Sequence, residues 1–310
     1  MANIIQKKIV TSQLTLTTAV IVSVALWVVC FLIRPVTNLI ETIGAYALYA
    51  LIGYLLIVIN KSFAIIRLRA SFQTVIFLTL VSICPVIHTI YEGTIMALCC
   101  LVSIFFLFNS FQKEWSAGLL FHAFIFWGIG CILVPKIVWI VPYLLYSCYI
   151  FKSLNIRSFV ASIFGLSIPI GGYVAYDFWD NQGVEIATKI AEITRIEGIA
   201  FDDIQMPICV MFLFMFVIFV VSATHSILYS MDEKMQTRCY LQHFIVTTTF
   251  LYVLAFSCIS ASLQLLPFIQ IGIGLLYGHF STLTHNKWSN LFFICILAFL
   301  IPVFIINLLF

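Results

Sequence analysis

Isolated ionisable residues lie where the long apolar segments of this chain end. Two of them, Arg34 and Lys136, are basic, and two, Glu92 and Asp177, are acidic. Guanidinium and ammonium groups suit a phosphate or pyrophosphate, and a partly buried carboxylate can act as a general base. If the segments pack as one bundle, Arg34 and Lys136 could bind a substrate, and Glu92 or Asp177 could be catalytic. The alternative is that each is a solvated residue at a helix end.

Two apolar segments contain helix-perturbing and polar residues. Segment 158–176 includes Pro169, and segment 262–277 includes Gln264, Pro267 and Gln270. Proline removes a helix hydrogen bond, and glycines nearby allow helices to approach closely. One interpretation is a pair of kinked, closely packed helices. The other is a pair of broken helices that expose backbone groups to a polar cavity, with Gln264 and Gln270 as substrate-binding residues.

No segment carries a recognisable catalytic, nucleotide or metal motif. The sequence has no phosphate-cradling glycine loop, no H-E-x-x-H and no G-x-S-x-G. Its histidines fit no metal-ligand spacing, and its ten cysteines include no C-x-x-C pair and lie in or beside apolar segments. We therefore expect no metal and no cofactor, and cysteines that act as small packing residues.

The elements that must position these residues are membrane-spanning helices. Hydrophobic side chains make up 63% of the 310 residues and charged ones only 9%, against roughly 25% charged in soluble domains. The apolar residues come in blocks long enough to cross a bilayer, where only helices satisfy the backbone of such segments. The predicted fold is an all-α transmembrane bundle, a single domain over residues 1–310. A net charge of +3 gives no indication of nucleic-acid binding.

Eleven spans are predicted, with ten to twelve possible. The closely spaced pairs at Lys136 and Ser260 leave open whether 137–151 and 262–277 cross fully. The first span follows Lys7 and Lys8 and has no small-residue cleavage site, so we expect it to be retained. The spans are 14–33, 43–59, 71–87, 94–110, 116–134, 137–151, 158–176, 207–228, 240–258, 262–277 and 291–309.

Lysine and arginine are distributed unequally between the two sides of this topology. The side with the N-terminus holds eleven: Lys7, Lys8, Lys61, Arg67, Arg69, Lys113, Lys152, Arg157, Lys234, Arg238 and Lys287. The other side holds four: Arg34, Lys136, Lys189 and Arg195. Because positive charge is retained in the cytoplasm, the bias predicts a cytoplasmic N-terminus and, with eleven spans, an external C-terminus.

The longest predicted loop, 177–206, lies on the outer side. It contains seven acidic residues and a central stretch in which Ile186, Ile190 and Ile193 share one helical face. Glu185 and Lys189 have the spacing of a helical ion pair. We expect an amphipathic helix that lies on the outer membrane surface or over the end of the bundle.

Residues 67–176 resemble an uncharacterised family of multi-pass inner-membrane proteins of Bacteroidota. The resemblance rests on Arg69-Ala-Ser-Phe, on the run at 107–112, and on residues 154–159 with Gly165 and Pro169 after them. It implies an inner-membrane location and no catalytic residues. Ala117-Gly-Leu-Leu, Pro135, Arg157 and Pro169 are also similar to a run in membrane glycosyltransferases that use lipid-linked sugars. Those enzymes have an acidic residue in a long first outer loop, where this chain has only Glu41.

Three hypotheses of function follow. The first is an envelope-assembly protein that acts on a lipid-linked glycan at the outer face. The second is a transporter of a small solute or lipid, and the third is a non-enzymatic membrane scaffold. Membrane lipids are the expected partners, a lipid-linked glycan is a further candidate, and the sequence identifies no protein partner.

Overall fold

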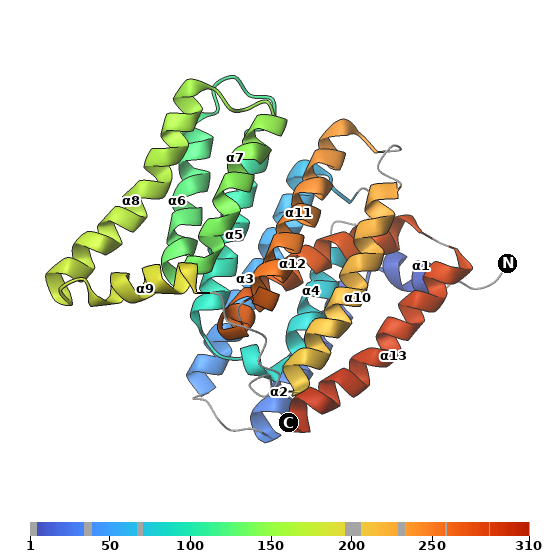
Figure 1. The fold of residues 1–310 in the computed structure, drawn as a ribbon. Helices are drawn as coiled ribbons and strands as arrows, with labels where there is room; N and C mark the ends of the chain where they lie inside the picture. The colour runs from blue at the N-terminus through green and yellow to red at the C-terminus, as the bar shows by residue number, and fades with distance from the viewer. Residues whose placement is uncertain are drawn as a thin grey trace. The chain divides into compact units, whose positions relative to one another are not determined.

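The chain is described by a computed structural model that covers residues 5–33, 39–66, 71–195, 206–228, 233–257, 259–284 and 286–309. These residues form helices, with no strand among them (Figure 1). The α-helices are α1 (Ile5–Thr11), α2 (Thr15–Ile33), α3 (Leu39–Phe63), α4 (Phe72–Ser82), α5 (Glu92–Asn109), α6 (Ala117–Leu133), α7 (Val141–Ile150), α8 (Ile156–Asp180), α9 (Val184–Thr194), α10 (Met206–Leu228), α11 (Met235–Ser257), α12 (Ile259–Leu283) and α13 (Lys287–Leu309). Two 3₁₀ turns, η1 (Pro85–Ile87) and η2 (Pro135–Ile140), interrupt this series. The prediction of an all-α fold is confirmed.

Eight of the described helices are long and apolar enough to cross a membrane: α2, α3, α5, α8, α10, α11, α12 and α13. The chain is therefore a membrane protein with several spans. The other three predicted spans also contain helix, but in shorter pieces: α4, α6 and η2 with α7.

Prolines explain two of the short pieces. The predicted span 71–87 ends early, because α4 stops at Ser82 and Pro85 opens a 3₁₀ turn. The predicted span 137–151 begins within η2, which starts at Pro135, and only continues as α-helix from Val141. Proline has no N–H to donate and fits the first turn of a helix, so each proline begins a new element.

The helices group into two compact units. Unit 1 contains Met1–Ile90, Ala200–Ile245 and Ile269–Phe310, and unit 2 contains Tyr91–Ile199 and Val246–Phe268. Two of the boundaries between the units fall within α11 and α12, so each of these helices contributes one end to each unit. The single domain over residues 1–310 remains a prediction.

In unit 1, a buried glutamine secures α1. The Gln6 amide donates to the carbonyls of Ser281 and Thr284, at 2.8 Å each, and accepts from the Ser289 hydroxyl at 2.7 Å. Its backbone N–H donates to the Asn290 side chain at 2.9 Å. All polar groups of this side chain are satisfied, which accounts for a glutamine with no exposed surface.

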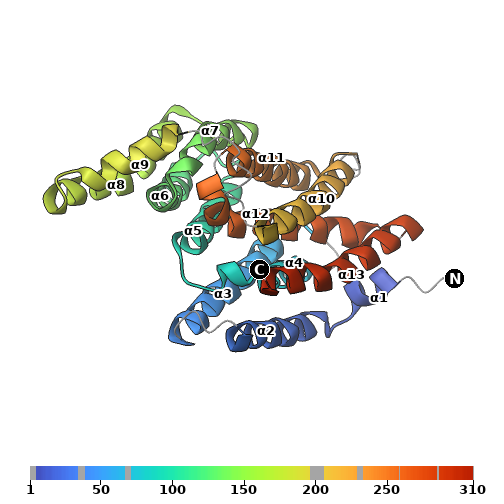
Figure 2. The ribbon, with the colours of Figure 1, turned by 60° about the horizontal axis from the view of Figure 1, so that its bottom comes forward.

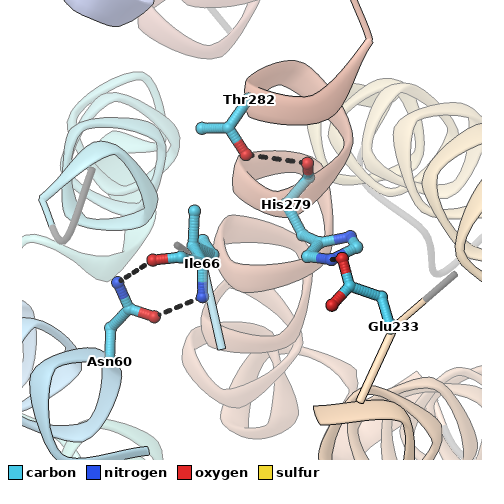
Figure 3. A network of polar contacts seen from close by, with 5 residues as sticks. All are labelled: Asn60, Ile66, Glu233, His279 and Thr282. Carbon is cyan, nitrogen blue, oxygen red and sulfur yellow. Dashed lines mark hydrogen bonds and ion pairs between the residues drawn. The ribbon is translucent and has the colours of Figure 1, made fainter. Parts of the chain in front are cut away.

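A second polar network of unit 1 surrounds the C-terminal half of α12 (Figure 3). Asn60 accepts from the N–H of Ile66 at 2.7 Å and donates to the carbonyl of the same residue, which closes the end of α3. His279 lies 3.8 Å from the Glu233 carboxylate, and both side chains are nearly buried. The two bonds of Asn60 fix the turn that follows α3.

In unit 2, α6 packs against both α5 and α8 (Figures 1 and 2). The α6–α8 contact depends on small residues. A methyl group at Gly165 would come 2.5 Å from the carbonyl oxygen of Phe121, and one at Gly128 would come 2.6 Å from Pro169. Both α8 and α12 remain helical through their internal prolines, Pro169 and Pro267. They are continuous helices, so the broken-helix interpretation is wrong, and Gly128 and Gly165 support close packing of α8 against α6.

Candidate functional site

The C-terminal end of α8 is joined to α9 by a buried carboxylate. Asp177 has no exposed surface, and its Oδ2 accepts from the backbone N–H of Ile186 in the first turn of α9 at 2.8 Å. Its Oδ1 has no hydrogen-bond partner among the described residues. Gly183, with φ of +82°, supplies the left-handed turn between the helices. Asp177 thus caps α9 and has one oxygen without a direct partner.

Tyr173 and Glu185 strengthen the same junction. The Tyr173 hydroxyl donates to Glu185 Oε2 at 2.9 Å, and the Asn181 amide donates to Glu185 Oε1 at 3.2 Å. The Lys189 ammonium lies over the Tyr173 ring, 5.4 Å from its centroid. Tyr173 is one turn before Asp177 on α8, so both side chains point to the same face of that helix.

Two further bonds hold α9 against the end of α6 and η2. The Lys189 ammonium donates to the carbonyl of Ile132 at 2.6 Å, where a cation is favourable because it lies at the C-terminal end of α6. The Trp139 indole donates to the carbonyl of Ile193 at 3.1 Å. Figure 1 shows α9 running from the end of α8 back across the end of α6. A helix does lie within the predicted loop 177–206, although its location on the outer membrane surface remains a prediction.

Glu92 is the first residue of α5 and meets the beginning of α12. The Gln264 amide donates to Glu92 Oε2 at 3.5 Å, and the Tyr91 hydroxyl donates to the Leu263 carbonyl at 3.2 Å. A methyl group at Gly93 would come 2.3 Å from the Gln264 carbonyl oxygen. Only glycine therefore allows the first turn of α5 to lie this close to α12. Glu92 is itself exposed, and its carboxylate is favoured at a helix N-terminus.

Both groups of residues belong to unit 2, in which η2 contacts α6, α7 and α9. Lys136 belongs to η2, which contacts α9, and is only 5% exposed. We call this set, all of it in unit 2, the rim cluster: Glu92, Lys136, Tyr173, Asp177, Glu185, Lys189 and Gln264. It brings the acidic candidates Glu92 and Asp177 into one region with the glutamine candidate Gln264.

Two of the predicted site residues are not part of the rim cluster. Arg34 lies outside the described residues. Gln270 belongs to unit 1, where it is fully buried and its amide donates to the Leu80 carbonyl at 3.3 Å. The Oε1 of Gln270 has no hydrogen-bond partner among the described residues, and its role in substrate binding stays a prediction.

Three residues of this region, Tyr173, Lys189 and Gly93, were not predicted from the sequence as members of the site. Tyr173 could have been found, because it precedes the candidate Asp177 by one helical turn. Lys189 was predicted only as a helical ion-pair partner of Glu185, whereas it binds a carbonyl of another helix. The role of Gly93 depends on a contact with a residue far along the chain, which no local pattern reveals.

Neither metal ligation nor similarity to known proteins adds to this geometry. Within the described ranges, no group of three or more His, Cys, Asp or Glu side chains could hold a metal ion. Comparisons with protein-family models, with curated proteins and with solved structures find no match. The arguments about function therefore rest on the rim cluster itself.

Proposed function

We propose that this chain is a multi-pass membrane enzyme of the cell envelope that transfers a sugar from a lipid-linked donor at the outer face. The rim cluster is its active site. The observation that supports this is that two carboxylates, Glu92 on α5 and Asp177 on α8, belong to one compact unit with the buried Lys136. Carboxylates and a cation at the end of a membrane bundle suit a substrate with an apolar tail and a phosphorylated sugar.

The proposed step is a displacement at the anomeric carbon of the donor sugar. The exposed Glu92 carboxylate accepts the proton of an acceptor hydroxyl. The oxygen of that hydroxyl forms the new glycosidic bond with the anomeric carbon. The bond from the anomeric carbon to the lipid pyrophosphate breaks, and the pyrophosphate retains the electron pair. The Lys136 ammonium neutralises the charge that develops on this leaving group. Gln264 holds the Glu92 carboxylate in position.

In this scheme Asp177 is a positioning residue. One of its oxygens already caps α9, and the whole side chain is buried. Its contribution is to hold α9, which contacts η2. Because Lys136 is only 5% exposed, the proposed step requires a rearrangement around η2 that brings the lysine to the pyrophosphate.

The proposed orientation puts the rim cluster outside. It is supported by the eleven-to-four division of the 15 lysines and arginines. The inner-membrane location is supported only by the resemblance to the Bacteroidota family. The continuity of α8 and α12 removes only the broken-helix interpretation, so a transporter of a small solute or lipid and a non-enzymatic scaffold stand as the alternative proposals.

A test in cells compares Glu92→Gln and Lys136→Gln with Asp180→Asn. Asp180 is a matched control, because it is an exposed acid at the end of a helix of unit 2 on the predicted outer side and is not a member of the rim cluster. Removing a general base lowers turnover by roughly 10²–10⁴-fold. We expect the Glu92 and Lys136 variants to accumulate lipid-linked sugar and lose the envelope glycan, at unchanged protein level. Full retention of the glycan in both variants would exclude this function.

A further inference from the structure

An open cavity of about 760 Å³ lies between the N-terminal ends of α6 and α8, in unit 2. The residues that lead into the two helices line it, including Trp115, Asn155 and Arg157. It is separate from the rim cluster, which gathers around the C-terminal ends of the same two helices. The segments that precede α6 and α8 therefore build a second concave feature.

Hydrogen bonds between the two segments give this cavity fixed walls. The buried Ser116 hydroxyl donates to the Ser153 carbonyl at 2.6 Å, and the Asn155 amide donates to the Glu114 carbonyl at 3.0 Å. Asn155 also caps α8 through the N–H of Ser158 at 2.8 Å. These hydrogen bonds hold the segments before α6 and α8 together, and the two segments form the walls of the cavity.

A cation and an aromatic ring are held together at its mouth. The Arg157 guanidinium lies over the Trp115 ring, 5.2 Å from the centroid, and Trp115 is 80% exposed. Lys113 and Lys152 are exposed in the same two segments, against the single acid Glu114. An exposed tryptophan with several cations at the end of an apolar helix is typical of the membrane–water interface.

An apolar surface continues from this mouth along α8. Ile156 is 87% exposed, and Phe159, Ile163 and Phe164 are 41%, 47% and 60% exposed on the following turns. An acyl chain would cover these side chains, while a negatively charged headgroup would occupy the cavity beside Arg157. Both parts of an anionic phospholipid therefore find a complementary surface.

We propose that this cavity is a binding site for the headgroup of an anionic phospholipid, with the acyl chains against α8. The three cations Lys113, Lys152 and Arg157 complement the lipid phosphate. On the predicted topology they face the cytoplasmic leaflet, which is the anionic one. The site does not depend on the function of the rim cluster.

The test is native mass spectrometry of the full chain with an equimolar mixture of dioleoyl phosphatidylglycerol and dioleoyl phosphatidylcholine. Wild type should retain the phosphatidylglycerol preferentially. Arg157→Gln, an exposed change that leaves the walls intact, should weaken its binding about fivefold, the contribution of one basic side chain near an anionic surface. Adding Trp115→Leu should weaken it further, whereas Arg157→Lys should retain part of the preference.

The matched control is the pair Lys287→Gln with Trp288→Leu. Trp288 is 81% exposed and follows a lysine at the start of α13, on the same predicted side, but neither residue lines this cavity. The control should bind phosphatidylglycerol as wild type does. The proposal would be overturned if the Lys287/Trp288 pair lost as much phosphatidylglycerol binding as the Arg157/Trp115 pair. It would also be overturned if wild type showed no preference over phosphatidylcholine, or if inorganic phosphate displaced the lipid completely.

Discussion

At the scale of the residue, two substitutions distinguish a structural cap from a catalytic carboxylate at Asp177. Asp177→Ala removes the acceptor for the N–H of Ile186. We therefore expect the free energy of unfolding to fall by about 1 kcal/mol and hydrogen exchange to become faster at the first turn of α9. Asp177→Asn retains an oxygen acceptor and should leave exchange and turnover close to wild type. Loss of turnover in Asp177→Asn with unchanged exchange would instead make Asp177 catalytic.

His88, in the connection between α4 and α5, gives the molecule a pH-dependent stability. Its ring stacks on Trp27 with centroids 3.8 Å apart, and its Nε2 lies 3.2 Å from the Val81 carbonyl. Burial lowers the pKa of His88 from 6.5 to about 4, against the opposing effect of the bond to Val81. The unfolded chain therefore binds a proton between these two values while the folded chain does not.

We predict from this pKa that acid destabilises the fold through His88. Stability should be unaffected by this group above pH 6.5 and fall as the pH drops from 6.5 to about 4, by at most about 1.4 kcal/mol per pH unit. His88→Phe retains an aromatic ring beside Trp27 and removes the titration. Thermal unfolding of both proteins in detergent over this range should show the smaller loss in the variant. An equal loss of stability with falling pH in wild type and in His88→Phe would contradict the role of His88.

At the scale of the element, the contact between α6 and α8 should depend on Gly165 and not on Gly171, another glycine of α8. Gly165→Ala places a methyl group 2.5 Å from the Phe121 carbonyl oxygen, while Gly171→Ala, in the same helix, meets nothing within 4 Å. We expect Gly165→Ala to lower the midpoint of thermal unfolding and Gly171→Ala to raise it slightly, since alanine favours a helix by roughly 0.5–1 kcal/mol over glycine. A similar change in both variants would rule out this close packing.

Local composition predicted most of the elements. Long apolar blocks at this density form helices in a membrane whatever their neighbours are, so each predicted span contains helix. The ends were less predictable. Pro85 and Pro135 begin 3₁₀ turns, and α8 extends to Asp180, where the N–H groups of Asn181 and Gly183 donate to the Asp177 carbonyl as the chain folds back into α9. Such ends depend on contacts between elements, which periodicity does not encode.

At the scale of the whole molecule, the sequence identified some members of the rim cluster but not its arrangement. Glu92, Lys136, Asp177 and Gln264 stood out because ionisable or polar residues are rare in this chain. Their convergence depends on Gly93 and on the bonds of Lys189 and Trp139, which join segments far apart in sequence. Gln270 looked equivalent to Gln264, yet it lies buried in unit 1.

The orientation is the prediction that concerns the whole chain. We expect a periplasmic phosphatase reporter to be active when fused after residue 310 or inserted at Gln182, and inactive when inserted at Gln112. A fluorescent protein that matures only in the cytoplasm should give the opposite pattern at the same sites. Phosphatase activity at Gln112 with fluorescence at the C-terminus would invert the topology and remove the rim cluster from the outer face.

The most direct test of the proposed activity is turnover by purified protein in liposomes supplied with a polyprenyl-pyrophosphate-linked sugar and an acceptor sugar. Wild type should release polyprenyl pyrophosphate in step with the glycosidic bond formed. Glu92→Gln should lower this rate roughly 10²-fold or more, while Asp180→Asn leaves it unchanged. A rate for Glu92→Gln equal to that of wild type, or no turnover by wild type with any lipid-linked donor, would contradict the proposal.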